Sequence, residues 1–330
     1  MSFLSPNNIT PLARNQENAA HAEPPRTDND ALLAAIEALN RVVVGKSTQI
    51  RLALTALLAR GHVLLEDLPG SGKTTLAKAL ARVLGLDNQR VQFTNDLLPG
   101  DILGGSVYHA QQGSMQFHPG PVFTQVLLAD ELNRASPRSQ SALLQAMEEN
   151  QVSIDGKSYK LAQPFFVIAT QNPVEQHGTQ MLPESQLDRF FMRLSLGFPD
   201  HGSEREILSG LSSDDKLQQL PAYLNAEELI RLQKDVASVH VSDAFLDYLQ
   251  RILQFSRDNQ IYTHGLSTRA GLALKQCAQA WAYLDGRYFV TANDLRCVLP
   301  SVCNHRLRFN SAYSDQSQET SEPLCRVAIP

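Results

Sequence analysis

The pattern of apolar and polar residues changes character once along the chain, near Pro199. Before that point, short apolar runs typical of buried strands alternate with stretches of helical periodicity. The strands are expected at residues 62–66, 125–130 and 165–170, and the helices at residues 74–84 and 139–149. Strand and helix in alternation predict a parallel β-sheet flanked by helices. We therefore expect an α/β domain over residues 31–200.

After Pro199 only helical periodicity remains. Asn225, followed three residues later by Glu228, has the spacing of a capping box that opens a helix. The apolar residues expected on one face of the next helix are Phe245, Leu246, Leu249, Ile252 and Leu253. Two more helical stretches follow. This part of the chain predicts a smaller all-α domain over residues 201–309.

Both ends of the chain lack apolar periodicity. Residues 1–30 are rich in Asn, Pro, Ala and Glu, and a polar stretch begins at residue 310. Such segments cannot bury enough apolar surface to offset the entropy lost on ordering. We expect a flexible N-terminal arm at residues 1–30 and a polar C-terminal tail at residues 310–330.

Composition narrows the classes of function. The chain has 330 residues and a net charge of −5, whereas a dedicated nucleic-acid binder usually carries a basic excess. Its apolar stretches are far shorter than the roughly 18 residues of a membrane span, and its start lacks the pattern of a secretion signal. The spacing of its Cys and His residues indicates no metal chemistry beyond Mg²⁺. We expect a cytoplasmic protein without a membrane span, for which nucleic acid is a disfavoured partner.

A glycine-rich segment follows the first predicted strand and precedes the first predicted helix; it reads Leu68-Pro69-Gly70-Ser71-Gly72-Lys73-Thr74-Thr75. This context is the one that a phosphate-binding loop requires, although a glycine-rich turn can also arise by chance. The two glycines let backbone N–H groups approach phosphate oxygens, Lys73 would reach the β- and γ-phosphates, and Thr74 would hold Mg²⁺. Asp67 occupies the place of the usual first glycine, and Asp tolerates a left-handed backbone better than most residues.

Two later apolar runs end in polar residues. Residues 126–129 lead into Asp130 and Glu131, and adjacent strand residues point in opposite directions. Asp130 could therefore face the metal, while Glu131 polarises the attacking water as a general base. Residues 166–171 lead into Asn172, which could orient that water or could only cap the following turn.

The order and wording of these motifs resemble the MoxR-type AAA+ ATPases. The resemblance covers about residues 31–307 and is carried by Leu-Leu-Ala-Asp-Glu-Leu-Asn-Arg-Ala at 127–135, Ser-Ala-Leu-Leu-Gln-Ala-Met-Glu-Glu at 141–149 and Leu-Pro-Glu-Ser-Gln-Leu-Asp-Arg-Phe at 182–190. It implies a P-loop NTPase core of the AAA+ type, with a parallel sheet flanked by helices and followed by an all-α lid. It also implies hydrolysis of ATP with Mg²⁺ in a hexameric ring.

The resemblance assigns roles to single residues. It makes Lys73 and Thr74 the Walker A pair, Asp130 and Glu131 the Walker B pair, and Asn172 the sensor 1 residue. The segment matching the one that lies against adenine is Val43, Val44 and Gly45.

Two arginines receive roles in the same way. Arg189 resembles the arginine finger, which acts on the nucleotide of a neighbouring subunit, although an arginine beside Asp188 and Glu184 could also form a surface ion pair. Arg269 is similar to the sensor 2 residue, which implies contact with the γ-phosphate of its own chain.

Residues 103–121 contain four glycines and alternate around Gln111-Gln112-Gly113-Ser114, which predicts a β-hairpin. MoxR-like proteins carry such an insertion within their second helix. We hypothesise that it presses on a client protein; a static hairpin is the alternative. The family also suggests a partner with a von Willebrand factor A domain.

Three functions remain open from the sequence. The first is a chaperone-like ATPase that remodels, matures or activates partner proteins. The second is a nucleic-acid-dependent AAA+ motor, and the third is a chelatase-type subunit that drives metal insertion. A GTPase fits poorly, because the chain has no Asn-Lys-x-Asp motif for reading guanine.

Overall fold

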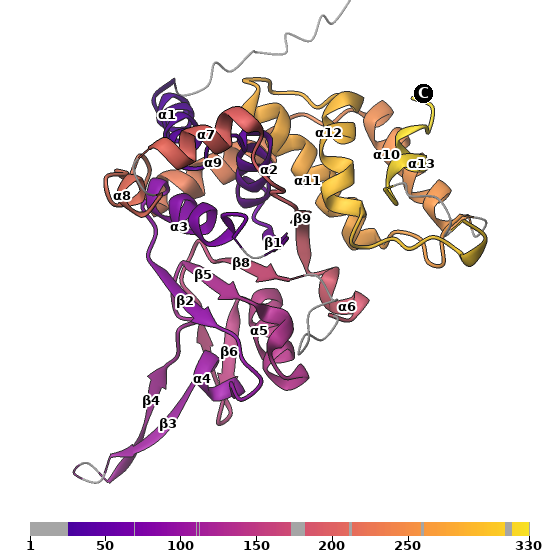
Figure 1. The fold of residues 1–330 in the computed structure, drawn as a ribbon. Coiled ribbons are helices and arrows are strands. Elements are labelled where there is room, and N and C mark those ends of the chain that lie inside the picture. The colour runs from indigo at the N-terminus through magenta and orange to yellow at the C-terminus, as the bar shows by residue number, and fades with distance from the viewer. Residues whose placement is uncertain are drawn as a thin grey trace, which may run out of the picture.

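The computed structural model describes residues 26–68, 70–109, 111, 113–172, 182–210, 213–258, 261–313 and 319–329. Most of the predicted N-terminal arm and Pro69 lie outside these residues. Figure 1 shows an α/β part, a helical part beside it, and a long hairpin that projects from the α/β part. Within the described residues, no helix is long and apolar enough to cross a membrane.

Five parallel strands form the central sheet in the order β2-β5-β8-β1-β9. They are β1 (His62–Glu66), β2 (Asn88–Gln92), β5 (Val126–Asp130), β8 (Phe166–Gln171) and β9 (Phe190–Leu194). The three strands β1, β5 and β8 are covered on both faces, which is why they read as continuous apolar runs. The predicted parallel sheet is confirmed.

Alternate residues of the central strands enter two separate hydrophobic cores. Val63, Leu128 and Ile168 pack with α1 (Arg26–Val42), α2 (Ser47–Leu58) and α3 (Lys73–Val83). Leu64 and Val167 face the other way and pack with α5 (Pro137–Glu149). The helix α5 begins at Ser136, whose hydroxyl accepts a hydrogen bond from the backbone N–H of Ser139, and Pro137 fills its first position.

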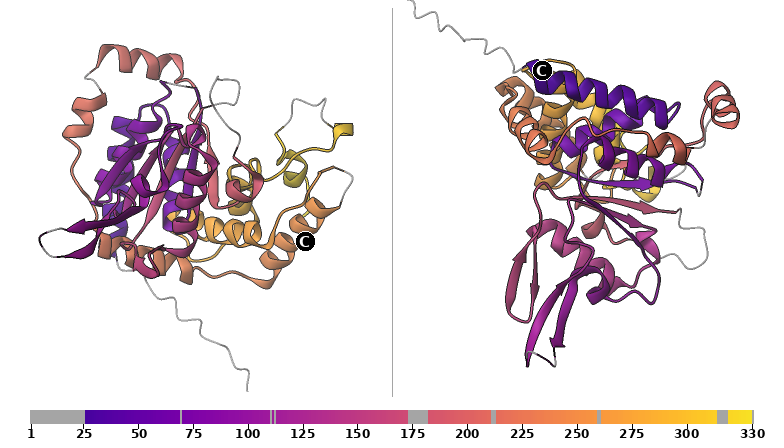
Figure 2. Two further views of the ribbon diagram at one scale, coloured as in Figure 1. Left: turned by 90° about the horizontal axis from the view of Figure 1, so that it is seen from below. Right: turned by 90° about the vertical axis from the view of Figure 1, so that its left-hand side faces the viewer.

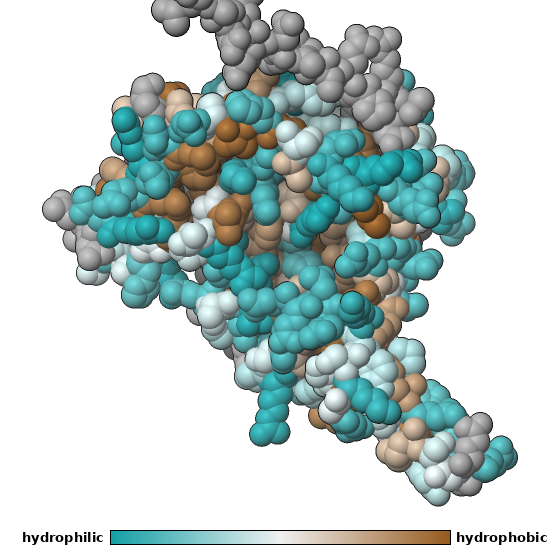
Figure 3. Space-filling model, turned by 180° about the vertical axis from the view of Figure 1, so that it is seen from behind, coloured by the Kyte–Doolittle hydropathy of each residue, from teal (hydrophilic) through white to brown (hydrophobic). Residues whose placement is uncertain are grey.

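Two hairpins leave the α/β domain on the same side (Figure 1; Figure 2). The predicted hairpin follows α4 (Pro99–Leu103) and consists of β3 (Gly104–His109) and β4 (Ser114–Pro119). Its outer part exposes Val107, Tyr108 and Met115, and it projects at the lower right of Figure 3.

The second hairpin, β6 (Gln151–Ile154) and β7 (Lys157–Lys160), was not predicted. Its turn residues Asp155 and Gly156 both have positive φ angles, of 49° and 74°. An Asp-Gly pair between segments of alternating polar and apolar residues is a signal for such a turn, so the sequence did carry a signal for this hairpin. The two hairpins touch where the rings of Phe117 and Tyr159 stack with 4.0 Å between centroids.

The helical domain is built from α9 (Ala226–Ser238), α10 (Asp243–Arg257), α11 (Thr268–Leu284) and α12 (Ala292–Cys303). Asn225 and Glu228 form the predicted capping box of α9. On α10, Phe245, Leu249 and Ile252 are buried as expected, but Leu246 is 41% exposed. The prediction for Leu246 was wrong because that residue lies on the solvent side of the helix.

Two segments differ from the predicted domain plan. The helices α7 (His201–Ser209) and α8 (Ser213–Gln218) precede the helical bundle, and α8 packs on α1 and α3 of the α/β domain. Arg82 of α3 ties that segment down by donating to the backbone carbonyls of Gln218 and Leu220. The chain end was expected to be a polar tail, but α13 (Glu322–Cys325) packs on α10 and α12 and buries Leu324 completely.

The remaining short elements are two 3₁₀ turns, η1 (Leu132–Arg134) and η2 (Ser311–Tyr313), and the helix α6 (Glu184–Leu187) just before β9. The first hydrophobic core runs without a break from α1–α3 into α9–α12. The lid is therefore packed against the α/β domain through apolar contacts.

Candidate active site

The predicted polar residues meet at the carboxyl edge of the sheet. The loop after β1, the pair Asp130 and Glu131 at the end of β5 and Asn172 after β8 line one cavity of about 360 Å³. Parallel strands bring the residues that follow them to the same edge, which is the usual place for a ligand in such folds. The predicted residues that line this cavity are Gly70, Ser71, Gly72, Lys73, Thr74, Thr75, Asp130, Glu131 and Asn172.

The glycine-rich loop has the conformation that its glycines allow. Gly70 and Gly72 have φ angles of 85° and 91°, in the left-handed region, and Gly72 caps α3. Lys73 is buried, and its Nζ lies 2.5 Å from the carbonyl oxygen of Asp67, 3.0 Å from that of Leu68 and 3.3 Å from Oδ1 of Asn172. Burial lowers the pKa of Lys73, and the charges of Asp67, Asp130 and Glu131 oppose that shift.

Asp67 has a different task from the one expected. Among the described non-glycine residues, positive φ angles occur at Arg60, Glu131, Asn150 and Asp155, so Asp67 does not replace glycine for its left-handed backbone. Its Oδ2 instead accepts hydrogen bonds from the N–H of Gly197 at 2.5 Å and from the hydroxyl of Ser195 at 3.2 Å.

The Oδ1 of Asp67 also accepts a hydrogen bond from the N–H of Leu68. The carboxylate therefore ties the phosphate loop to the segment that follows β9.

The two adjacent carboxylates at the end of β5 are held by different partners. Oδ1 of Asp130 accepts from the Thr170 hydroxyl at 2.6 Å, and its Oδ2 lies 2.6 Å from Nη2 of Arg90. Glu131 has a left-handed backbone with a φ angle of 57°. Its side chain accepts from Asn172 at Oε1 and from Gln92 at Oε2, over 3.3 and 2.9 Å.

Sequence reasoning missed three residues of this cavity, namely Arg90, Gln92 and Thr170. Arg90 and Gln92 belong to β2, an edge strand in which Val91 alone is buried, so no apolar run announced it. The parallel pairing of β2 with β5 sets Gln92 beside Asp130. The alternation of polar residues around Val91 was the only signal that could have found them.

The predicted adenine segment does not line this cavity. Val43 is buried, and Gly45, with a φ angle of 74°, lies against the start of α7. A Cβ atom at Gly45 would come within 2.3 Å of the Ser203 hydroxyl oxygen. The next residue, Lys46, donates to the carbonyl of Phe198 at 2.7 Å. The role of residues 43–45 toward adenine stays a prediction.

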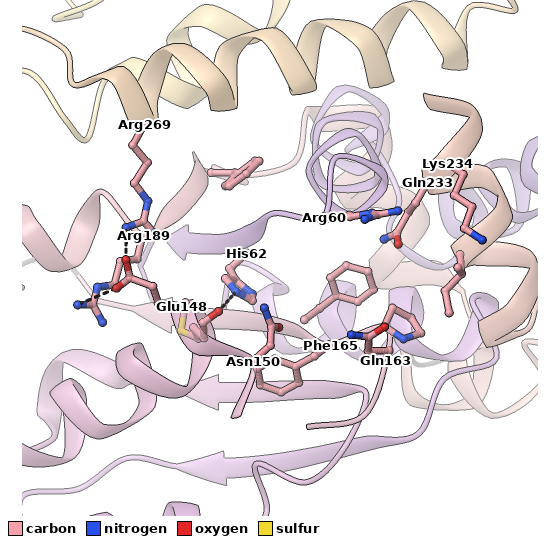
Figure 4. Close-up of a pocket in the computed structure, with 15 residues that line it drawn as sticks. Arg60, His62, Glu148, Asn150, Gln163, Phe165, Arg189, Gln233, Lys234 and Arg269 are labelled. Atoms are coloured by element: carbon pink, nitrogen blue, oxygen red, sulfur yellow. Dashed lines mark hydrogen bonds and ion pairs between the residues drawn. The ribbon is translucent and has the colours of Figure 1, made fainter. Parts of the chain in front are cut away.

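Arg189 and Arg269 lie at the opposite edge of the sheet. Arg189 directly precedes β9, and Arg269 is in the first turn of α11. Both pair with Glu148 near the end of α5, at 3.1 Å and 3.0 Å, as Figure 4 shows. They line a cavity of about 480 Å³ together with His62, the first residue of β1.

The position of Arg269 bears on the role expected for it. A strand of five residues spans about 16 Å, so the amino edge of β1 lies far from the phosphate loop at its carboxyl edge. In this structure Arg269 therefore lies away from the phosphate loop of its own chain, and its role toward the γ-phosphate stays a prediction. The surface pairing of Arg189 with Asp188 or Glu184 is not observed, since Arg189 pairs with Glu148.

The cavity at the amino edge is strongly positive. Its lining carries the cations of Arg60, Arg189, Lys234 and Arg269 and the single carboxylate of Glu148. His62 adds no charge near neutral pH, because burial lowers its pKa from 6.5 to about 4. Its Nδ1 accepts from the N–H of Val167, so its Nε2 donates to the carbonyl of Met147.

Comparison with known proteins identifies the family. Residues 62–192 match the family described as "ATPase family associated with various cellular activities (AAA)", and residues 254–324 match the "AAA lid domain". The chain is 38% identical to the "Chaperone MoxR1" of Mycobacterium tuberculosis over 303 residues, which are 87% of this chain and 80% of that protein. The chain belongs to the MoxR family of AAA+ ATPases.

Further comparisons agree with this assignment. The MoxR-family chain is 33% identical to "Protein MoxR" of Paracoccus denitrificans, covering 88% of this chain and 93% of that protein. A solved structure of a putative ATPase from Cytophaga hutchinsonii superimposes with a TM-score of 0.82 at 34% identity, over 90% of this chain and 93% of the other. The predicted family and fold class are confirmed, and the protein is an enzyme that binds and hydrolyses ATP.

Proposed function

We propose that this MoxR-family ATPase works in a homo-oligomeric ring, in which the amino edge of one protomer completes the nucleotide site of the next. The observation that carries this proposal is the separation of the two halves. The phosphate loop and Glu131 lie at the carboxyl edge of the sheet, while Arg189 and Arg269 lie at its amino edge. Contact between opposite edges of identical chains is a head-to-tail interface, which closes into a ring when the rotation allows.

The charges of the two cavities support this pairing. In the carboxyl-edge cavity the cations of Lys73 and Arg90 are balanced by Asp130 and Glu131. The triphosphate of ATP is strongly anionic, so that cavity alone leaves much of its charge uncompensated. The amino-edge cavity of a neighbour has a surplus of cations. An arginine supplied in this way is worth roughly 10³ to 10⁵ in rate, or about 4 to 7 kcal/mol.

Each residue at the carboxyl edge has a chemical task in this proposal. The backbone N–H groups of residues 70–73 and the ammonium of Lys73 bind the phosphate tail. Glu131 takes the proton of the attacking water, and Asn172 and Gln92 hold its carboxylate from both sides. The Thr74 hydroxyl and the Asp130 carboxylate are the hard oxygen donors that Mg²⁺ prefers, so they fit this ion, which would neutralise charge on the phosphates.

We infer that the partner which this ATPase remodels is a protein. A relative at 38% identity carries the name chaperone, and the hairpin β3–β4 exposes three apolar side chains at its outer part. Exposed apolar residues on a projecting element are suited to gripping an unfolded or flexible partner. By resemblance, the ring is hexameric and the client is a protein with a von Willebrand factor A domain. Capture of proteins on the Glu131→Gln variant loaded with ATP would identify the client.

Mixing two inactive variants tests the shared site. Arg189→Ala protomers keep their phosphate loop, and Lys73→Ala protomers keep their arginines, so mixed rings should recover part of the ATPase rate. Rings that are shown to be mixed but stay inactive would exclude an arginine in trans.

A second mixture separates the two possible roles of Arg269. If Arg269 also serves the neighbour, rings of Arg189→Ala and Arg269→Ala protomers stay inactive, because each interface lacks one of the two arginines. If Arg269 serves its own chain, an Arg189→Ala protomer beside an Arg269→Ala protomer forms a complete site, and the rate recovers.

A further inference from the structure

A buried arginine of the lid holds the segment that carries Arg189. Arg306 follows α12, and its side chain is 4% exposed. Its Nε donates to Oδ1 of Asp188 at 2.7 Å, and its Nη2 donates to the carbonyls of Asp188 and Phe190 at 3.2 and 2.6 Å. Its Nη1 donates to the carbonyl of Phe191 at 3.1 Å. The guanidinium therefore contacts the residues on both sides of Arg189.

The same carboxylate reaches the helix that carries Arg269. Oδ2 of Asp188 accepts a hydrogen bond of 3.3 Å from the hydroxyl of Ser267. Ser267 is the N-cap of α11, and Arg269 lies two residues further on. Asp188 thus connects the end of α12, the start of α11 and the loop before β9. Of the three arginines that line the amino-edge cavity, Arg189 and Arg269 start from this junction.

The ion pair between Arg306 and Asp188 is not needed to hold the lid on the α/β domain. The lid already shares a continuous apolar core with the α/β domain, to which α12 contributes Leu299 and Val302 and β9 contributes Met192. The Arg306 side chain is 4% exposed and that of Asp188 is 25% exposed. Taking an ion pair largely out of water seldom adds net stability, because desolvation offsets the Coulomb attraction. A guanidinium that donates to several acceptors at once instead fixes the relative positions of those acceptors.

A neighbouring ion pair between the lid and the same segment is, by contrast, exposed to solvent. Arg308, two residues after Arg306, also crosses from the lid to the segment before β9 and pairs with Glu184 at 3.1 Å. Its side chain is 55% exposed, and that of Glu184 is 47% exposed. Exposed pairs of this kind contribute little and restrict geometry weakly. Arg308 is therefore a matched control for Arg306.

We propose that Arg306 is a positioning residue for ATP hydrolysis on the neighbouring protomer. Through Asp188 and the backbone of residues 188–191 it sets the direction of Arg189, and through Asp188 and Ser267 it sets the start of α11 and so the direction of Arg269. A displacement of the lid is transmitted to both arginines at once. This inference rests on the proposed function, in which Arg189 acts in trans.

The test uses Arg306→Gln in the full chain, with Arg308→Gln as the control. Arg306→Gln should bind ATP as tightly as the wild type and form rings, but its ATPase rate should fall on the order of 100-fold, the loss expected when a catalytic group is misplaced by about 1 Å. Arg308→Gln should stay within about twofold of the wild-type rate.

Mixed rings distinguish positioning from a general structural defect. An Arg306→Gln protomer has an intact phosphate loop, so mixing it with Lys73→Ala protomers should restore part of the rate. Mixing it with Arg189→Ala protomers should restore nothing, because both fail at the same task. A structural defect in the Arg306→Gln chain would instead spoil its own nucleotide site, and Lys73→Ala protomers would then bring no recovery.

Two outcomes would overturn the inference. One is a wild-type rate for Arg306→Gln. The other is that the mixture of Arg306→Gln and Lys73→Ala protomers stays inactive, although the reference mixture of Arg189→Ala and Lys73→Ala protomers recovers activity. If that reference mixture also fails, the proposed function falls together with this inference. Should Arg306→Gln not fold, Asp188→Asn removes only the charge from the junction and must give the same pattern of recovery.

Discussion

The hydroxyl of Thr170 donates a hydrogen bond of 2.6 Å to Oδ1 of Asp130 and accepts one of 2.9 Å from the backbone N–H of Glu131. One fully buried side chain on β8 thus holds both carboxylate residues at the end of β5, Asp130 within the strand and Glu131 just after it. Thr170→Val keeps the shape but removes the partner of Oδ1 of Asp130 and of the Glu131 N–H, while Arg90 still pairs with Oδ2 of Asp130. Leaving such buried groups unsatisfied costs about 1–3 kcal/mol. We expect this variant to lose thermal stability and to hydrolyse ATP at least about tenfold more slowly.

Thr170→Ser provides the matched comparison, because it keeps the hydroxyl and removes only the methyl group. Its hydrolysis rate should stay close to that of the wild type. Equal rates for the Val and Ser variants would show that the hydroxyl does not position Asp130.

Glu131 is expected to be the general base for water attack. Glu131→Gln should bind ATP normally and form rings but lose at least about 100-fold in turnover, since an amide cannot accept the proton. The measurements are nucleotide binding by calorimetry and phosphate release. Glu149→Gln, at an exposed acidic residue of α5, should leave the rate unchanged. A Glu131→Gln enzyme with half its activity would remove this residue as the base.

Asp67 distinguishes two explanations for an acidic residue in a phosphate loop. If it only substituted for the usual first glycine, Asp67→Gly would be neutral or beneficial. Because its carboxylate accepts hydrogen bonds from Gly197 and Ser195, we expect Asp67→Gly to lose about 1–3 kcal/mol of stability and to bind ATP more weakly. Urea unfolding and nucleotide titration measure both effects. A stability equal to the wild type would contradict the role given to this carboxylate.

His62 predicts loss of stability in acid. Its pKa is about 4 in the folded chain and 6.5 in the unfolded chain, so between these values the unfolded state binds the proton and the folded state does not. The free energy of unfolding therefore falls as the pH is lowered from 6.5 to 4, by about 3 kcal/mol from this residue. His305, whose pKa is also lowered by burial, acts in the same direction.

His62→Gln checks this prediction, because glutamine can accept from Val167 and donate to Met147 without titrating. Urea unfolding at pH 7 and at pH 4.5 should show a smaller acid loss for the variant than for the wild type. An identical loss would mean that His62 does not carry the pH dependence.

The sequence was most informative where an element is buried on both faces. Residues 62–66 were predicted with the observed bounds, because the apolar run Val63-Leu64-Leu65 comes directly before the glycine-rich segment and is typical of a strand buried on both faces. The motifs at Lys73, Asp130 and Asn172 could be brought together in advance, since parallel strands end at a common edge.

Other features depend on contacts that no local pattern reveals. The strand β2 exposes four of its five residues, so Arg90 and Gln92 enter the site only through pairing with β5. The partner of Arg269 depends on which edge of the sheet the lid approaches, and spacing along the chain carries no information about that. For the same reason Glu148 and Arg306 could not be distinguished from other charged residues near helix ends.

The opposed placement of phosphate loop and arginines gives the chain a direction. If neighbouring protomers share a site as we propose, the first nucleotide site of an open row receives no arginines from a neighbour, and the last pair of arginines has no nucleotide. When the row closes into a ring, the arginines of the last protomer meet the nucleotide site of the first. The ATPase rate per protomer should therefore rise with protein concentration, and each chain that cannot accept a neighbour would leave its own nucleotide site without arginines and keep the row open.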